Sequence, residues 1–195
     1  MYTSTRMNHT SHNVDPFAFT IKTSSQKSRA RRGELLTPHG VVQTPAFVTV
    51  GTKATVKGLS PEDLQKVGTQ FIFANTYHLT LSPTPEVVQK HGGVHMLSGI
   101  SKPMITDSGG FQVFSLAARD RSSTDTHRKL EVSTDDGDSP AHPHLIKITE
   151  DGVIFHSHID GTKHEFTPEN SIRIQQQIGA DFMVAFDECI YNNAT

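Results

Sequence analysis

Two carboxylates and a glycine-rich run are the residues of this sequence best suited to chemistry. The first carboxylate, Asp107, is followed by Ser108, Gly109, Gly110 and Phe111. Two glycines let the backbone turn sharply and bring N–H groups close to a ligand. An aromatic ring beside them can stack on a planar molecule. The run therefore suits a flat polar heterocycle, although Asp107 could equally cap a turn or helix while Phe111 lies in the core.

The second carboxylate is Asp187, with Glu188 beside it. A carboxylate can accept two parallel hydrogen bonds from a guanine-type edge, one from N1–H and one from the exocyclic amine. It can instead form a salt bridge with a neighbouring strand or loop. Two carboxylates in one pocket also suit a glycosidase, with one as the acid and the other as the base or nucleophile. Only geometry separates these alternatives.

The histidines are less specific. His156 and His158 share one face of a predicted strand and His164 is close in sequence, so a metal site is conceivable. The polar face of an exposed hairpin explains the same pattern. His78, which follows Asn75, is a better candidate for the mouth of a pocket, or it holds a loop.

A repeated unit must position these residues: a capped helix, a glycine, an apolar strand and a polar residue. Predicted helices begin after Ser60, Thr84 and Thr167, each followed by proline, and end at Gly68, Gly92 and Gly179. Ser60 and Asp63 form a capping-box pattern. Predicted strands span 44–50, 71–74, 103–106 and 182–186. Three of them are followed by Asn75, Asp107 and Asp187.

Buried strands that alternate with helices predict an α/β fold with a parallel sheet. An open Rossmann-like sheet and a (β/α)8 TIM barrel both fit this pattern. No G-x-G-x-x-G follows the first strand, which weakens the dinucleotide-binding alternative. Polar residues after several strands are where a barrel builds its active site. We therefore expect the first half of a barrel, within a single domain spanning 16–195.

Other segments depart from the repeat. Residues 1–15 are polar and are expected to be a disordered tail. Residues 17–42 predict an antiparallel strand pair, with turn signals at Arg32-Gly33 and His39-Gly40. The hydrophilic stretch 117–143 predicts a flexible insertion. Residues 144–166 alternate as a β-hairpin or meander inserted between the third and fourth barrel strands.

Composition is that of a soluble globular protein, with 34% apolar and 19% charged residues among 195. No apolar run approaches the roughly 20 residues that span a bilayer. No signal-peptide core opens the chain, so we expect a cytoplasmic protein. The single Cys189 excludes an internal disulfide and offers no cysteine metal cluster. Residues 1–33 are basic despite the net charge of -2, which suggests either a phosphate-binding arm or a solvated tail.

The order of six short segments gives the sequence a specific resemblance. Across roughly 17–195 it resembles the queuine/preQ1 tRNA-ribosyltransferase family, the tRNA-guanine transglycosylases. The segments that carry this resemblance are 44–48, 75–79, 105–113, 157–161, 171–175 and 186–189.

The resemblance implies a (β/α)8 barrel with an N-terminal antiparallel sheet. It also implies exchange of guanine at the wobble position of tRNAs with a G-U-N anticodon for a 7-deazaguanine base, in queuosine biosynthesis. The expected chemistry is double displacement at the ribose C1′ carbon. Expected partners are the tRNA anticodon loop, the base and a second copy in a homodimer. The family also binds Zn²⁺.

Carried over by motif, Asp107 is the proton acceptor that acts on the base, and the run from Asp107 to Phe111 lines the base pocket. Asp187 reads the guanine-like edge. Asn75 and His78 are expected on the ribose side. Bacterial members that use preQ1 resemble this sequence in Asp-Glu-Cys, whereas eukaryotic members that use queuine, whose side chain is larger, tend to carry a small branched residue at the position of Cys189. The sequence therefore favours preQ1.

The family's nucleophilic aspartate, its second base-contact loop and its Cys-x-Cys-x-x-Cys…His zinc site would all follow Thr195. We accordingly expect a truncated chain that lacks the nucleophile and the zinc ligands, and that is inactive and poorly folded alone. A non-catalytic tRNA-binding or dimer-partner subunit of the same family is the main alternative. An archaeosine-type enzyme matches less well around Asp187 to Cys189.

Overall fold

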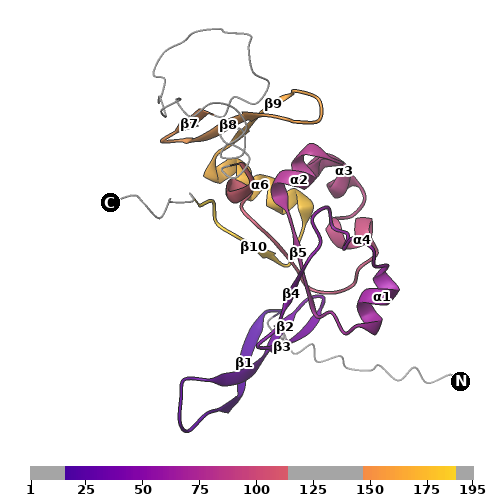
Figure 1. Ribbon diagram of the computed structural model, residues 1–195, viewed down its shortest axis with the longest axis vertical. Coiled ribbons are helices and arrows are strands. Elements are labelled where there is room, and N and C mark those ends of the chain that lie inside the picture. Colours follow the sequence, from indigo (N-terminus) through magenta and orange to yellow (C-terminus); the bar gives the residue numbers. More distant parts are fainter. Residues whose placement is uncertain (1–15, 114–146, 188–195) are drawn as a thin grey trace, which may run out of the picture.

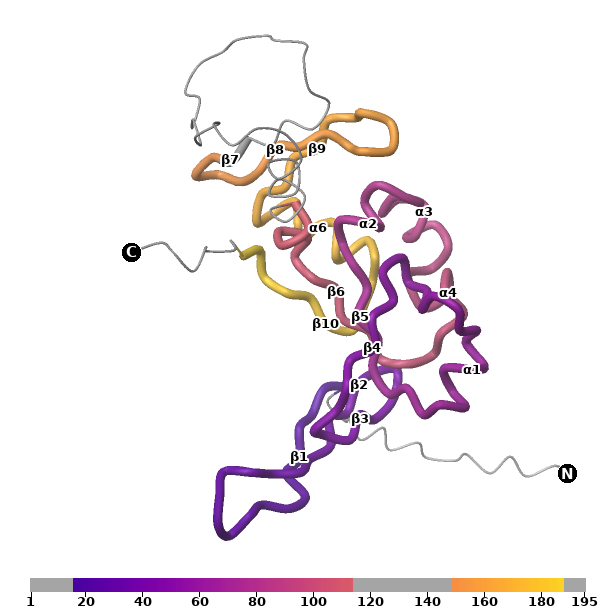
Figure 2. The backbone as a smooth tube through the Cα atoms, in the orientation of Figure 1, coloured from indigo at the N-terminus to yellow at the C-terminus, as the bar shows by residue number. Residues whose placement is uncertain are grey.

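The computed structural model describes residues 16–113 and 147–187 (Figures 1 and 2). The predicted tail at 1–15, the predicted insertion at 117–143 and Cys189 lie outside these ranges. Within the described residues, three separate sheets and a layer of helices form the fold. No helix in this part of the chain is long and apolar enough to cross a membrane.

A parallel sheet forms the centre of the molecule. It contains β4 (Val48–Val50), β5 (Phe71–Ala74), β6 (Met104–Thr106) and β10 (Phe182–Met183), in the order β10-β6-β5-β4. All three pairings are parallel, which confirms the predicted sheet type. Each strand lies beside the previous one in the chain, as in a barrel wall, whereas a doubly wound sheet reverses at a switch point. A closed barrel remains a prediction.

Three helices begin where the sequence predicts: α1 (Pro61–Lys66), α3 (Pro85–Lys90) and α6 (Pro168–Ile178). The capping box is confirmed, because Asp63 N donates to Ser60 Oγ over 3.1 Å and Ser60 N donates to Asp63 Oδ2 over 3.2 Å. Two further short helices, α2 (Thr76–Leu81) and α4 (Val94–Ser98), were not predicted.

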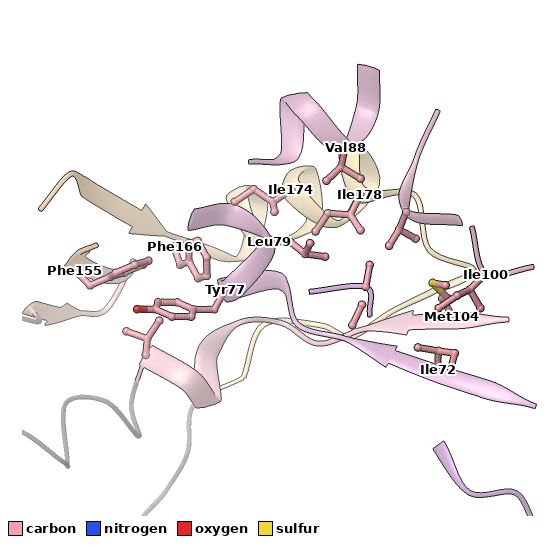
Figure 3. Close-up of a cluster of buried hydrophobic side chains, with 14 of the residues drawn as sticks. Ile72, Tyr77, Leu79, Val88, Ile100, Met104, Phe155, Phe166, Ile174 and Ile178 are labelled. Carbon is pink, nitrogen blue, oxygen red and sulfur yellow. The ribbon is translucent and has the colours of Figure 1, made fainter. Parts of the chain in front are cut away.

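The core lies between the helices and the parallel sheet. Figure 3 shows Leu79, Val88, Ile174 and Ile178 grouped where α2, α3 and α6 meet. Ile72 and Met104, which are fully buried, extend this cluster to the strands. Burial of these side chains fixes α6 over the strand ends, since interiors are close-packed and tolerate little displacement.

An antiparallel sheet precedes the parallel one. It contains β1 (Ala18–Ser24), β2 (Arg31–Thr37) and β3 (Gly40–Thr44), in that order, so the predicted strand pair is a three-stranded sheet. The turn predicted at Arg32-Gly33 is wrong, because both residues lie inside β2. The chain reverses at 25–30 instead, where Ser25 N donates to Ala30 O over 2.9 Å. The turn before Gly40 is as predicted.

The segment between the third and fourth parallel strands is a three-stranded meander. It contains β7 (Lys147–Thr149), β8 (Gly152–His156) and β9 (Lys163–Phe166), all antiparallel, as predicted. Its aromatic side chains face α2: the ring centroids of Phe155 and Tyr77 lie 5.3 Å apart, and those of Phe155 and Phe166 lie 5.1 Å apart (Figure 3). The meander is thereby anchored near the carboxyl ends of the parallel strands.

Two strands are shorter than the sequence predicts. The strand expected at 44–50 comprises only Val48–Val50, because Thr44 belongs to β3 and Pro45 has no N–H to donate to a ladder. The strand expected at 182–186 comprises only Phe182–Met183. Val184 N still donates to Thr106 O over 3.2 Å, and both backbone groups of Val184 also bind a helix side chain, as described below.

Candidate functional site

Asp107 follows β6 and is held by the segment that follows β5. Its carboxylate accepts hydrogen bonds from Asn75 Nδ2 over 2.8 Å and from Thr76 N over 2.6 Å. Thr76 Oγ1 donates to the backbone carbonyl of Asp107 over 2.5 Å. Thr76 is the first residue of α2, whose own N-cap residue, Asn75, makes no side-chain capping bond. Asp107 therefore caps α2 from the neighbouring strand, where its negative charge also suits the helix dipole.

Asp187 lies at the same edge of the sheet, four residues after β10. Ser108 Oγ donates to Asp187 Oδ1 over 2.6 Å and accepts from Gly110 N over 3.2 Å. Ser108 is buried, whereas Asp187 is exposed. The two carboxylates thus come from paired strands and are linked through the residue that follows Asp107. The hydroxyl of Ser108 orients Asp187.

The two glycines of the run are close to other parts of the chain. Gly109 has φ +82°, a conformation that favours glycine, and an added Cβ would collide with the ring of Phe166. At Gly110 an added Cβ would lie 2.5 Å from the carbonyl oxygen of Asp187. The glycines therefore let the run approach both the meander and the segment that carries Asp187.

Phe111 is 59% exposed at the start of a helical turn, so its ring is accessible to a planar ligand. His78 is near Asp107. Burial, followed by the charges of Lys53 and His158, lowers the pKa of His78, while Asp107 acts in the opposite direction. Asn75 is buried and its amide is bound to Asp107, which makes it a support for that carboxylate.

The histidines of the meander do not gather into a group of metal ligands within the described residues. His158 Nδ1 instead lies 3.2 Å from the hydroxyl of Tyr77. His164 stacks on Phe155 with ring centroids 5.4 Å apart. These contacts connect the meander to the core.

Sequence reasoning missed three side chains that support the site: Thr76, Ser171 and Gln175. Thr76 was detectable in principle, because it directly follows a strand-end polar residue. Ser171 and Gln175 lie on one face of α6, four residues apart, and both are fully buried. Buried polar residues at that spacing in an amphipathic helix are a usable signal for an internal hydrogen-bond network.

A second cluster of titratable side chains lies at the opposite end of the strands. Asp181 Oδ1 is 2.7 Å from His39 Nδ1, and Asp181 Oδ2 is 3.2 Å from His95 Nε2. The two imidazoles stack in parallel, 3.5 Å apart. One ring nitrogen of each histidine and a carboxylate oxygen of Asp181 are close enough to one another to hold a shared metal ion. Parallel stacking would nevertheless place such an ion far from the plane of each ring, so hydrogen bonding to the carboxylate describes the cluster better.

This cluster predicts a loss of stability in mild acid. Burial, followed by the charge of His39, lowers the pKa of His95 below its ordinary 6.5, while Asp181 partly opposes the effect. The unfolded chain, in which this His titrates normally, therefore binds more protons as the pH falls through about 6.5, and unfolding becomes easier. The urea concentration at the midpoint of unfolding should therefore decrease as the pH is lowered from 7.5 to 5.

The matched variants for this prediction are His95→Gln and His91→Gln. The first should make the midpoint less dependent on pH, although not independent, since burial lowers the pKa of His78 and His164 in the same direction. The second alters an exposed histidine and should leave the dependence as in the wild type. Equal slopes for both variants would contradict the assignment to His95.

Comparison with known proteins identifies the relatives of this chain. The family model described as Queuine tRNA-ribosyltransferase matches residues 25–195. A queuine tRNA-ribosyltransferase of Herpetosiphon aurantiacus is 47% identical over 176 residues, covering 90% of this chain and 38% of the relative. One from Thermus thermophilus is 45% identical, with the same coverage. One from a Roseiflexus species is 44% identical over 171 residues, covering 88% of this chain and 41% of the relative. The chain thus spans about two fifths of the length of these relatives.

Proposed function

Because this chain belongs to the queuine tRNA-ribosyltransferase family, we propose that it is the base-binding part of an enzyme that exchanges guanine at the tRNA wobble position for a 7-deazaguanine base. The observation that carries the proposal is the pair of carboxylates on neighbouring strands, linked by the hydrogen bond from Ser108 to Asp187. This arrangement provides one group for proton transfer and one for base recognition.

The side chains of the site have separate roles in this proposal. Asp107 accepts a proton from the base, which is why its orientation by Asn75 and Thr76 matters. Asp187 accepts hydrogen bonds from N1–H and from the exocyclic amine of guanine. Phe111 stacks on the base. Asn75 and His78 lie toward the ribose.

The wider reaction is double displacement at the ribose C1′ carbon of tRNAs with a G-U-N anticodon. We propose that the attacking aspartate belongs to the part of the family's length that this chain does not span. The family's zinc is proposed to lie there too, because its site needs three cysteines and this sequence contains only Cys189. Closure of the barrel, homodimerisation and a cytoplasmic location complete the proposal.

The direct test is incorporation of labelled guanine into tRNA by the complete gene product. Transfer to tRNAs with a G-U-N anticodon, and none to tRNAs with other wobble bases, is the expected result. Binding of tRNA without exchange would instead support a non-catalytic subunit of the same family.

Substrate choice gives a further prediction, at Cys189. If this side chain limits the space beside the base, Cys189→Ala, which removes the sulfur atom, should shift preference from preQ1 toward queuine by about 10-fold, the discrimination that about one methylene group in a pocket provides. Competition between the two bases in the exchange assay measures the ratio. Cys189→Ser, which keeps an atom at the γ position, is the control. An unchanged ratio in the alanine variant would disprove the argument that the size of this side chain limits queuine.

A further inference from the structure

The amide of Gln175 is 0% exposed and takes part in four hydrogen bonds. Its Oε1 accepts from Thr106 Oγ1 over 2.8 Å and from Val184 N over 3.1 Å. Its Nε2 donates to Val184 O over 2.9 Å and to Ser171 Oγ over 3.1 Å. An amide has two acceptor sites and two N–H donors, so all of its hydrogen-bonding capacity is used.

Two of these contacts hold the residue that follows β10. β10 ends at Met183, and both backbone groups of Val184 bind the amide of Gln175, while Val184 N also donates to Thr106 O over 3.2 Å. A side-chain amide presents the same donor and acceptor as a peptide group of an adjacent strand. Gln175 therefore fixes the path of the chain just after β10, three residues before Asp187.

The other two contacts lead to Asp107. Thr106 precedes this carboxylate and donates directly to Gln175. Ser108 follows it, and its backbone carbonyl accepts from Ser171 Oγ over 2.7 Å. Since Ser171 also accepts from Gln175, the residues on both sides of Asp107 are tied to the same amide.

We propose that Gln175 is a positioning residue that sets the placement of Asp107 and Asp187 relative to one another. Three segments, the end of β6, the start of α6 and the residues after β10, meet at this one buried amide. This role rests on the proposed function and extends it, because it states how the buried amide of Gln175 contributes to base binding. Gln175 acts on the base through the two carboxylates.

The test compares Gln175→Met with Gln176→Met in the complete gene product. Methionine keeps the approximate length of the side chain but removes all four hydrogen bonds at position 175, whereas Gln176 is exposed on the same helix. For Gln175→Met we expect the KM for guanine to increase and kcat to decrease, each by about 10-fold, the effect expected from a few lost buried hydrogen bonds. Gln176→Met should match the wild type in both constants.

A double-mutant cycle distinguishes positioning from a general loss of stability. If Gln175 acts through Asp187, the KM penalty of Gln175→Met should largely disappear in an Asp187→Asn background, because effects that share one route are not additive. Full additivity, or constants within twofold of the wild type for Gln175→Met, would overturn the proposal. Should this variant fail to fold, Ser171→Ala removes two hydrogen bonds of the network, those to Ser108 O and from Gln175 Nε2, and should raise the KM in the same direction by a smaller factor.

A second measurement does not depend on catalysis. Amide hydrogen exchange of the segment 182–187 should become faster in Gln175→Met and stay unchanged in Gln176→Met. If the wild type exchanges no guanine, the proposed function fails, while this measurement still shows whether Gln175 holds the segment. Unchanged protection of 182–187 in Gln175→Met would disprove the positioning role itself.

Discussion

Replacing Asp107 with asparagine in the complete gene product is expected to lower the kcat of guanine exchange by about 10²–10⁴-fold, the usual contribution of a positioned proton acceptor. Asparagine preserves the size of the side chain and can still accept from Thr76 N. It cannot take up a proton. Its NH2 group would face Asn75 Nδ2, but Asn75 can rotate its amide to present oxygen, so the local fold should persist.

The control for this prediction is Asp151→Asn. Asp151 is exposed in the turn between β7 and β8, remote in sequence from the glycine run. Its replacement removes the same charge and should leave kcat unchanged. Exchange rates measured at saturating tRNA and saturating guanine give kcat directly. A kcat for Asp107→Asn within threefold of the wild type would show that another group accepts the proton.

Elements whose ends depend on local chemistry were predictable from the sequence. The capping box at Ser60 and Asp63, and the capping bond from Asn170 N to Thr167 Oγ1, mark helix starts that the sequence specifies within a few residues. Gly179 ends α6 in the left-handed conformation that glycine adopts easily. The parallel sheet followed from strands that alternate with such helices.

Elements that depend on distant residues were not predictable. α2 has no cap of its own, because its capping carboxylate is Asp107, 31 residues away from Thr76. The residue after β10, Val184, is held by the amide of Gln175 in addition to its backbone bond to Thr106. The stacked pair of His39 and His95 joins the turn between β2 and β3 to α4, which only the folded chain brings together. In each case a tertiary contact decides the local structure.

The same distinction between local and tertiary determinants applies to the candidate site. Asp107 and Asp187 were placed at one edge of the sheet from sequence, because the carboxyl ends of parallel strands meet there. The hydrogen bonds that orient them were not foreseen. Ser108 was expected to face a ligand, yet its hydroxyl binds Asp187 and Gly110. The sequence thus indicates which residues gather, and the structure adds which atoms hold them.

Asp187→Asn is the second change with a large expected effect, this time on base selectivity. Guanine presents two donors, N1–H and the exocyclic amine, which match the two acceptors of a carboxylate. An amide would oppose one of those donors with a donor of its own. We expect kcat/KM for guanine to decrease by about 10²-fold, since a charge-assisted hydrogen bond is replaced by an unsatisfied pair.

The same substitution should admit xanthine. Xanthine presents N1–H as a donor and O2 as an acceptor, which match the oxygen and the NH2 group of an amide. Ser108 should fix the orientation of that amide, because its proton is directed at the Oδ1 position while it accepts from Gly110 N. Xanthine should therefore inhibit incorporation of labelled guanine by Asp187→Asn more strongly than by the wild type. Adding Ser108→Ala to Asp187→Asn should reduce the inhibition by xanthine, because the amide at position 187 could then adopt either of its two orientations. A variant that loses guanine without gaining xanthine would mean that Asp187 supports the pocket but does not contact the edge of the base.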